Sequence, residues 1–259
     1  MSSLSPFVKS RYEIAFTWSS SRGFLHAQNM LEGFTGTLLT DGYAAYSKTV
    51  ATLNEKEKTI THATCWVHAR RYFDSALLIE PLAAQAAIDK IALLYKIEKH
   101  IKENITEASD ALAYRQKHSE PLVTEFFNWV YEQRQRTDLT PKNQLTKALH
   151  YVNERQVEMK VFLANPDVAM DTNHIERALR VIPMGRKNYL FCWSELGAEQ
   201  LGILQSLLVT CRLQEINPYH YLVDVLQRVS MHPASKVEEL TPRIWKEKFA
   251  DNFLTSDLA

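Results

Sequence analysis

A long stretch without glycine, residues 80–165, most limits what this chain can fold into. Leu, Ala, Lys, Glu and Gln dominate it, and the strand-like alternation of the preceding residues stops. Its apolar side chains recur at helical spacing in three stripes, punctuated by Pro81, Pro121 and Pro141. The stripes are Ile88, Ile91, Ala92 and Tyr95; Phe126, Phe127, Val130 and Tyr131; and Leu145, Ala148, Leu149 and Val152. The stretch therefore predicts packed helices, with the aromatic residues as core.

The residues before this stretch indicate alternating strands and helices. Large apolar residues at every second position of residues 12–18 predict a strand, residues 24–31 a helix and residues 34–40 a second strand. This order suggests a β-α-β unit, whose functional residues follow the carboxyl ends of strands. Asp41 stands in that position. Asp41 and Gly42 equally fit a turn, in which the carboxylate binds the backbone and glycine supplies a positive φ.

A helix over residues 44–53 and a strand over residues 59–64 then lead into CWVHARRYF, residues 65–73. Cys65 and His68 are three residues apart and would share one face of a helix. They could form part of a metal site, but two ligands do not make a zinc site. A packed or hydrogen-bonded histidine beside the basic pair Arg70 and Arg71 is the favoured interpretation.

The segment DTNHIERALRVIPMGRKNYLF, residues 171–191, concentrates charge on a predicted helix. Ile175, Ala178, Leu179 and Ile182 have the spacing of one buried face, and Asn173, Glu176, Arg177 and Arg180 share the opposite one. Asn173 and Glu176 also fit an N-cap with its capping-box partner, and Glu176 with Arg180 an ordinary i,i+4 pair. Pro183 and Gly185 are expected to end the helix before Arg186 and Lys187. Such a cluster of cations around one carboxylate suits phosphate binding.

The last part of the chain is predicted to be helical at first and irregular at its end. A helix over residues 195–215 is expected to bury Leu201, Leu204, Leu207, Leu208 and Cys211. Asn217 and Pro218 break it, a helix over residues 219–229 follows, and the tail from Met231 is expected to be mostly irregular.

Composition excludes several classes of protein. Thirty Lys and Arg balance thirty Asp and Glu, so DNA binding would depend on local patches. Three cysteines without a C-x-x-C motif indicate neither a disulfide framework nor a cysteine zinc site. Glycine-rich nucleotide-binding motifs are missing. Without a membrane-length apolar run or a signal peptide, the chain is expected to be a cytoplasmic globular protein.

Five motifs, in this order along the chain, together resemble the transposases of the insertion-sequence-66 family. They are DGYAAY at 41–46, CWVHARRYF at 65–73, DTNHIERALR at 171–180, GRKNYLF at 185–191 and NPYHYLVDVL at 217–226. The resemblance implies an α/β, ribonuclease-H-like catalytic core that is incomplete at the N-terminus, with a large all-helical insertion and a helical C-terminal part. The implied boundaries are residues 1–79 and 166–215 for the core, 80–165 for the insertion, and 216–259 for the C-terminal helix and tail.

The resemblance also implies a site and its partners. Asp41 and Glu176 would be the second and third acids of an Asp-Asp-Glu set that holds Mg²⁺ or Mn²⁺ for DNA strand cleavage and transfer. Hard oxygen ligands suit these ions. Arg177, Arg180, Arg186 and Lys187 would contact DNA, and Cys65, His68, Asp171 and Asn173 would support the site. Element ends and target DNA are the implied partners, with a homo-oligomer and other proteins of the element as further candidates and no membrane partner.

Two departures from the family pattern leave the activity of this chain open. Thr172 stands where the family usually has asparagine, and residues 1–40 contain no aspartate, only Glu13 and Glu32. One hypothesis is an active transposase that takes its third ligand from elsewhere, such as Glu13. A second, favoured hypothesis is a truncated product without the first catalytic aspartate, which keeps DNA or partner binding. A third is a helical interaction protein that docks through residues 80–165.

Overall fold

A computed structural model describes residues 3–10, 13–19, 23–56, 59–189, 192 and 194–256, with backbone only for 3–10, 56 and 186–189. The chain forms two compact units. One unit comprises residues 23–173, and the other joins residues 1–22 to residues 174–259. Helices dominate both, and each unit has one small sheet. The expectation of a mixed α/β fold with extensive helical parts is confirmed at this level.

The unit of residues 23–173 begins with helix α1 (Phe24–Leu31) and a parallel strand pair. Strands β3 (Gly36–Thr40) and β4 (Ile60–Thr64) pair in parallel, and helix α2 (Ala44–Lys56) connects them. The predicted β-α-β unit was therefore placed one strand too early, because the strand before α1 belongs to a different sheet. The predicted strands over 34–40 and 59–64 are confirmed, although they begin later, at Gly36 and Ile60.

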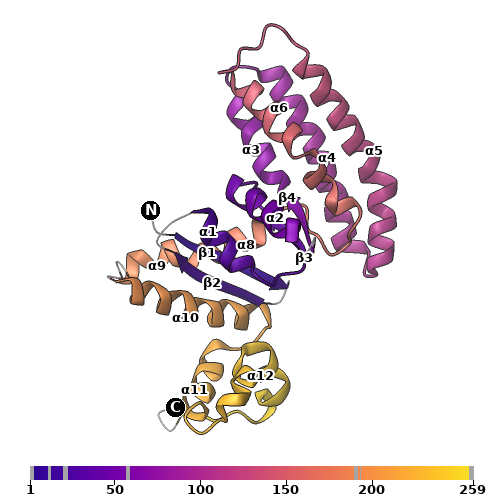
Figure 1. Ribbon diagram of the computed structural model, residues 1–259. Helices are drawn as coiled ribbons and strands as arrows, with labels where there is room; N and C mark the ends of the chain where they lie inside the picture. The colour runs from indigo at the N-terminus through magenta and orange to yellow at the C-terminus, as the bar shows by residue number, and fades with distance from the viewer. Residues whose placement is uncertain are drawn as a thin grey trace. The chain divides into compact units, whose positions relative to one another are not determined.

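The rest of this unit is a bundle of helices (Figure 1), and the fully buried Trp66 belongs to its core. Its helices are α3 (Trp66–Ala76), α4 (Pro81–Asn104), α5 (Ala108–Arg134), α6 (Gln144–Glu154), α7 (Gln156–Lys160) and the 3-10 turn η1 (Val161–Leu163). Two features correct the predicted pattern. Pro121 lies inside α5 and does not end a helix, and Tyr131 is exposed outside the core. The predicted core residues Phe126, Val130 and Leu149 are buried.

The other unit pairs an N-terminal hairpin with a long helix. Strands β1 (Ser3–Ser10) and β2 (Glu13–Ser19) are antiparallel, and β2 packs on α10 (Glu195–Leu213). Ile14 and Phe16 are buried, while their backbone N–H groups donate to Thr210 Oγ1 (3.1 Å) and Ser206 Oγ (2.7 Å). The strand over 12–18 is confirmed. Strand β1 was missed because its polar sequence lacks the alternation of large apolar residues.

Helices α8 (Asn173–Leu179) and α9 (Val181–Tyr189) meet at a break at Arg180. The prediction that Pro183 and Gly185 end the helix is wrong, since both lie within α9. Pro183 is the third residue of α9, where a missing N–H costs little and the fixed φ of proline suits a helix. The predicted burial of residues 189–191 lies outside the side chains that the structure describes.

The C-terminal part folds into a compact element. It contains α11 (Pro218–Arg228), the 3-10 helix η2 (Ala234–Leu240), α12 (Pro242–Lys248) and the 3-10 turn η3 (Ala250–Asn252). The predicted helix over residues 219–229 is confirmed, whereas the tail from Met231, expected to be mostly irregular, forms a helix and two 3-10 segments. Asp224 lies at its centre, fully buried, and accepts hydrogen bonds from Arg228, from Trp245 Nε1 (2.7 Å) and from the Leu254 N–H (2.7 Å). On α10, Leu204 is exposed, against the prediction, while Cys211 is buried as expected.

Over the described part of the chain, none of the helices combines the length and the apolar content that a membrane crossing requires.

Candidate functional site

The carboxyl ends of β3 and β4 bring two predicted site residues to one edge of the parallel pair. Thr40 and Thr64 are register partners at the strand ends, so Asp41 and Cys65 follow neighbouring strands. The Cys65 N–H donates to the carbonyl oxygen of Thr40 over 2.9 Å, which extends the ladder by one bond. Functional residues of parallel sheets commonly occupy this edge.

Asp41 forms a turn and remains exposed. Its Oδ1 accepts a hydrogen bond from the Tyr43 N–H (2.9 Å), and Gly42 has a φ of 81°. These are the two features of the turn interpretation, in which the carboxylate binds the backbone and glycine supplies the left-handed conformation. The exposed position of Asp41 keeps the carboxylate accessible from solvent. The turn therefore orients an accessible acid at the strand end.

Two side chains from the helical bundle hold this turn in place. Tyr151 Oη donates to the carbonyl oxygen of Asp41 (2.9 Å), and Arg155 Nη2 donates to that of Gly42 (3.1 Å). Tyr151 stacks on Tyr72 with ring centroids 4.3 Å apart, and the Arg155 guanidinium lies 4.2 Å from the Tyr151 ring centroid. The sequence analysis missed Tyr151 and Arg155. Contacts more than a hundred residues away in sequence leave no local signal.

Cys65 is fully buried, and its sulfur is hydrogen-bonded. The backbone N–H and the hydroxyl of Thr172 lie 3.3 Å and 3.4 Å from Sγ. Burial alone would raise the pKa of the Cys65 thiol, but hydrogen bonds from His68 and Thr172 outweigh it and lower that pKa. Hydrogen bonding to Cys65 raises the pKa of His68 against the effect of its burial, and the nearby negative charge of Asp41 adds to the rise. Asp41, Cys65 and His68 thus form one electrostatic group.

This group favours the hydrogen-bonded histidine over the metal pair. Arg71 Nη1 lies 3.1 Å from His68 Nε2, beside the predicted basic pair. Across the described residues, no three His, Cys, Asp or Glu side chains gather in a way that could hold a metal ion. Asp41 nevertheless has the donor type that Mg²⁺ prefers, because its carboxylate supplies hard oxygen ligands, and the residue is exposed. The residue fits the ion chemically as one ligand of a larger set.

Asp171 and Asn173, on either side of Thr172, are hydrogen-bonded to each other at the start of α8. Asp171 accepts hydrogen bonds from the Asn173 backbone N–H (2.9 Å) and side-chain Nδ2 (2.8 Å). Asn173 is therefore the first residue of α8 and not its N-cap, and Asp171 supplies the capping carboxylate. Burial and the negative charge of Asp171 raise the pKa of Tyr95, so that its hydroxyl stays protonated beside this acid. The Trp66 N–H donates to the Met170 carbonyl oxygen (3.0 Å), which ties this segment to α3.

Glu176 lies in the other unit, in the first turn of α8, and is half-buried. Arg177 and Arg180 are exposed. Of the predicted apolar face, Ala178 and Leu179 pack against buried Ile182 in a small cluster with Ile14, Phe16 and Val209, whereas Ile175 is half-buried and outside that cluster. Arg186 and Lys187 belong to α9 by their backbone, and their side chains lie outside the description. The structure thus groups Asp41, Cys65, His68, Asp171 and Asn173 in one unit and Glu176 with its basic neighbours in the other.

Comparison with known proteins identifies the class first. A family model described as "Transposase IS66 family" matches residues 5–200, and a model of the "IS66 C-terminal element" matches residues 206–243. The chain therefore belongs to the IS66 family of transposases. The second match runs from within α10 through α11 and Asp224 into the tail from Met231, which the sequence analysis expected to be mostly irregular.

The relatives come from Sinorhizobium fredii (strain NBRC 101917 / NGR234). The uncharacterized protein y4hP is 32% identical over 246 residues, which cover 90% of this chain and 44% of that protein. The uncharacterized protein y4jD is 30% identical over 238 residues, covering 90% of this chain and 46% of the relative. The chain thus spans less than half the length of these relatives. No solved structure matches it.

Proposed function

We propose that this chain takes part in metal-dependent DNA strand cleavage and transfer during movement of an insertion sequence, as a transposase of the Asp-Asp-Glu type. Membership of the IS66 family supports transposition. The observation that supports the chemistry is the exposed carboxylate of Asp41 at the end of β3, in a turn fixed by Tyr151 and Arg155. An oriented, accessible acid at this edge suits phosphoryl transfer in a ribonuclease-H-like core, which we propose for residues 1–79 and 166–215.

Asp41 and Glu176 are the residues that would hold Mg²⁺ or Mn²⁺. Such ions, when bound as a pair, activate the attacking oxygen and stabilise the leaving one in a phosphoryl displacement. The chain itself orients Asp41 through Tyr151 and Arg155 and keeps Glu176 on a helix with Arg177 and Arg180. These exposed guanidiniums suit the DNA backbone, and we place Arg186 and Lys187 in the same role. Cys65, His68, Asp171 and Asn173 support the turn region.

Cleavage of DNA that carries the ends of the element tests this proposal. We expect Asp41→Asn and Glu176→Gln each to lower Mg²⁺-dependent cleavage by at least about a hundredfold, because each removes a negative ligand and keeps the shape of the side chain. Asp89→Asn and Glu103→Gln are matched controls, since both acids are exposed on α4. Cleavage that survives both site substitutions would show that these acids are not catalytic.

A second candidate function is DNA binding without cleavage. Two observations favour it. The described residues contain no cluster of three metal-ligating side chains. In addition, Glu13, the alternative third ligand, accepts a hydrogen bond from Arg243 Nε over 2.9 Å within an ion pair. Salt-sensitive DNA binding by the wild-type chain, together with no cleavage in Mg²⁺ or Mn²⁺, would support this candidate over the first.

A further inference from the structure

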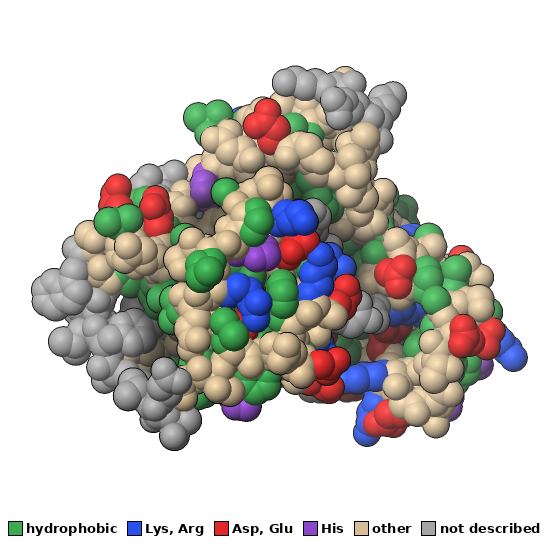
Figure 2. Space-filling model, turned by 90° about the horizontal axis from the view of Figure 1, so that it is seen from below, with side chains coloured by type: hydrophobic (Ala, Val, Ile, Leu, Met, Phe, Trp, Pro, Cys, Tyr) green, Lys and Arg blue, Asp and Glu red, His purple; other side chains and the backbone are tan. Residues whose placement is uncertain are grey.

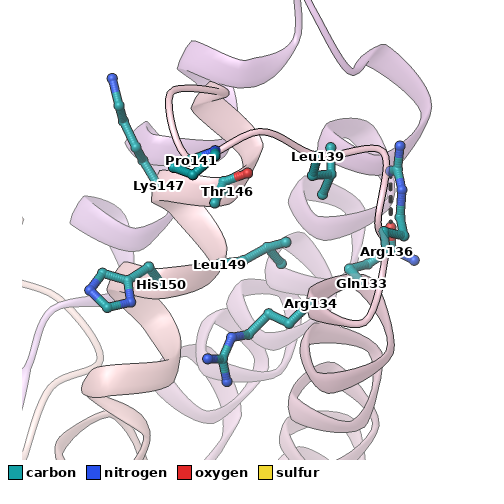
Figure 3. A pocket seen from close by; sticks show the side chains of 9 residues that line it. All are labelled: Gln133, Arg134, Arg136, Leu139, Pro141, Thr146, Lys147, Leu149 and His150. Carbon is teal, nitrogen blue, oxygen red and sulfur yellow. Dashed lines mark hydrogen bonds between the residues drawn. The ribbon is translucent and has the colours of Figure 1, made fainter.

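A pocket of about 400 Å³ lies at one end of the helical bundle, away from the strand pair of the same unit. Its walls are the end of α5, the connection over residues 135–143 and the start of α6 (Figure 3). Cavities of roughly 300–1,000 Å³ accommodate small organic ligands. The pocket belongs to the segment that the sequence analysis interpreted as packed helices and, in its third hypothesis, as a docking surface.

One side of the pocket is apolar. Leu139, Pro141 and the buried Leu149 line it, and Figure 3 shows Leu149 directed from α6 toward Leu139. Gln133 and Thr146 add polar groups beside this surface. An apolar floor of this kind suits the face of a planar ring better than a fully hydrated ion.

The remaining lining residues are His150, which lies 3.0 Å from Glu154, and three cations, of which two are not neutralised. Arg136 is paired with Asp138 (2.6 Å) and Glu80 (3.1 Å), so it belongs to the framework. Arg134 Nη1 donates to the neutral amide oxygen of Asn153 (2.7 Å), and Lys147 is exposed. Among the described side chains, no carboxylate lies within ion-pair distance of Arg134 or Lys147. These two residues therefore carry positive charge that is available to an anion.

Hydrogen bonds hold the pocket in its open shape. Glu80 accepts from Arg136 and also from Asn143 Nδ2 (3.1 Å). Asn143 in turn caps α6 through the Leu145 N–H (2.8 Å). Thr146 Oγ1 donates to the carbonyl oxygen of Thr140 (2.8 Å), which fixes the connection against the helix. A ligand would meet walls that are already ordered, which lowers the entropic cost of binding.

The charge around the pocket differs from that of the surface drawn in Figure 2. On the face drawn in Figure 2, the coloured Lys and Arg side chains are interspersed with acidic and apolar ones. The chain as a whole has no net charge. Around the pocket, Asp138 and Glu80 pair with Arg136 and Glu154 lies beside His150, so Arg134 and Lys147 are the lining cations without an ion-pair partner among the described side chains.

We infer that this pocket binds one nucleotide unit of a DNA strand, with the ring on Leu139 and Pro141 and the phosphates on either side of that unit beside Arg134 and Lys147, whose side chains extend to opposite sides of the pocket in Figure 3. Positive grooves combined with ring-binding surfaces are the general means of holding single-stranded nucleic acid. The source of the nucleotide, a DNA strand, rests on the proposed function. The site would give the helical segment a DNA contact of its own, separate from Asp41 and Glu176.

Metal-free binding tests the site without involving cleavage. In EDTA, fluorescence anisotropy of a short single-stranded oligodeoxynucleotide is measured over a salt series with the full chain. We expect Arg134→Ala/Lys147→Ala to weaken binding roughly tenfold at low salt and to lower the salt slope by about 1.4, at about 0.7 per lost contact. Lys99→Ala/Lys117→Ala removes the same charge from exposed positions near the other ends of α4 and α5, and should leave the slope nearly unchanged.

Further measurements distinguish a DNA strand from a free nucleotide or phosphate, and contacts to the ring from contacts to the phosphates. Leu139→Ser should weaken binding without changing the salt slope, because it alters only the ring-binding surface. A deoxynucleoside monophosphate should compete weakly and inorganic phosphate more weakly still. Thermal melting checks that each variant is folded, and Lys147→Arg, which keeps the charge, should bind like the wild type.

The proposal has defined ways to fail. Unchanged affinity and slope in Arg134→Ala/Lys147→Ala, or no oligonucleotide binding by the wild type, would overturn it. A monophosphate that binds more tightly than the oligonucleotide would overturn the DNA source. Because no metal is present and Asp41 and Glu176 are unaltered, these results leave the cleavage proposal standing. Loss of cleavage in Glu176→Gln with intact pocket binding would separate the two roles.

Discussion

Asp41 follows a strand in a unit with one large core, whereas Glu176 stands on a seven-residue helix that has no buried residue. Around Asp41, Tyr151 and Arg155 bind the turn backbone, and α3 and α6 pack behind it. Around Glu176, a cluster of four buried residues supports α8 and α9, which are broken at Arg180. Asp41 is therefore held in place by its unit, and we expect the segment with Glu176 to be the less stable of the two.

The largest effect that would test this contrast is expected from Trp66→Ala. Trp66 is fully buried, donates from Nε1 to the Met159 carbonyl oxygen (2.9 Å), and contacts Phe126 with ring centroids 5.3 Å apart. Its loss should lower the free energy of unfolding by about 3–5 kcal/mol. Ile182→Ala, in the small cluster near Glu176, should cost about 2 kcal/mol. Urea denaturation monitored by circular dichroism compares the two, and equal costs would contradict the contrast.

The unit that carries Glu176 is expected to have its firmest point at Asp224, in the C-terminal element. Asp224→Asn should cost about 2–4 kcal/mol, because Arg228 loses its buried partner. Burial opposes ionisation, but bonds from Arg228, Leu254 and Trp245 outweigh it and lower the pKa of Asp224 below 3.8. A lowered folded pKa gives stability that is present above pH 3.8 and is lost as the pH falls toward the folded value.

Unfolding measured across this acidic range should therefore show a loss of stability in the wild type that is smaller in Asp224→Asn. If the free energy of unfolding of the wild type changes little with pH, or changes equally in the variant, ionised Asp224 does not stabilise the C-terminal element.

Gly42→Ala measures how tightly the Asp41 turn is held. Gly42 has a φ of 81°, and a Cβ there would collide with Tyr151 Oη and approach Arg155. The matched control is Gly33→Ala, where φ is 72° and a Cβ would meet no atom within 4 Å. The control isolates the backbone cost of about 1–2 kcal/mol. Gly42→Ala should exceed it, and equal values in thermal denaturation would mean that Tyr151 and Arg155 do not crowd the turn.

The smallest effect is expected from Pro183→Ala. Pro183 occupies the first turn of α9, where its N–H would not be needed, so the change in stability should stay below about 0.5 kcal/mol. Pro121→Ala is the comparison, because Pro121 interrupts the middle of α5 and its replacement should stabilise the chain by about 1 kcal/mol or more. A large loss at Pro183 would indicate that the α8–α9 break depends on proline.

The sequence by itself determined the elements whose periodicity is strong and the family to which the chain belongs. The helices of residues 80–165, the strands ending in Thr40 and Thr64, and the apolar face of Ala178, Leu179 and Ile182 follow from local spacing. Helix ends were less predictable. Pro121, Pro183 and Gly185 lie within helices because packing and position overrode their local preference.

Only the tertiary structure decided how strands pair and which distant residues meet. The pairing of β2 with β1, and of β3 with β4, depends on hydrogen bonds between strands that local periodicity does not encode. Tyr151 reaches the Asp41 carbonyl oxygen across 110 residues, and Thr172 reaches Cys65 across 107. In the C-terminal element, buried Asp224 of α11 accepts hydrogen bonds from Trp245 and from the Leu254 N–H, which lie in the tail that local periodicity left unassigned. A local pattern specifies secondary structure, but such contacts exist only once the chain has folded around them.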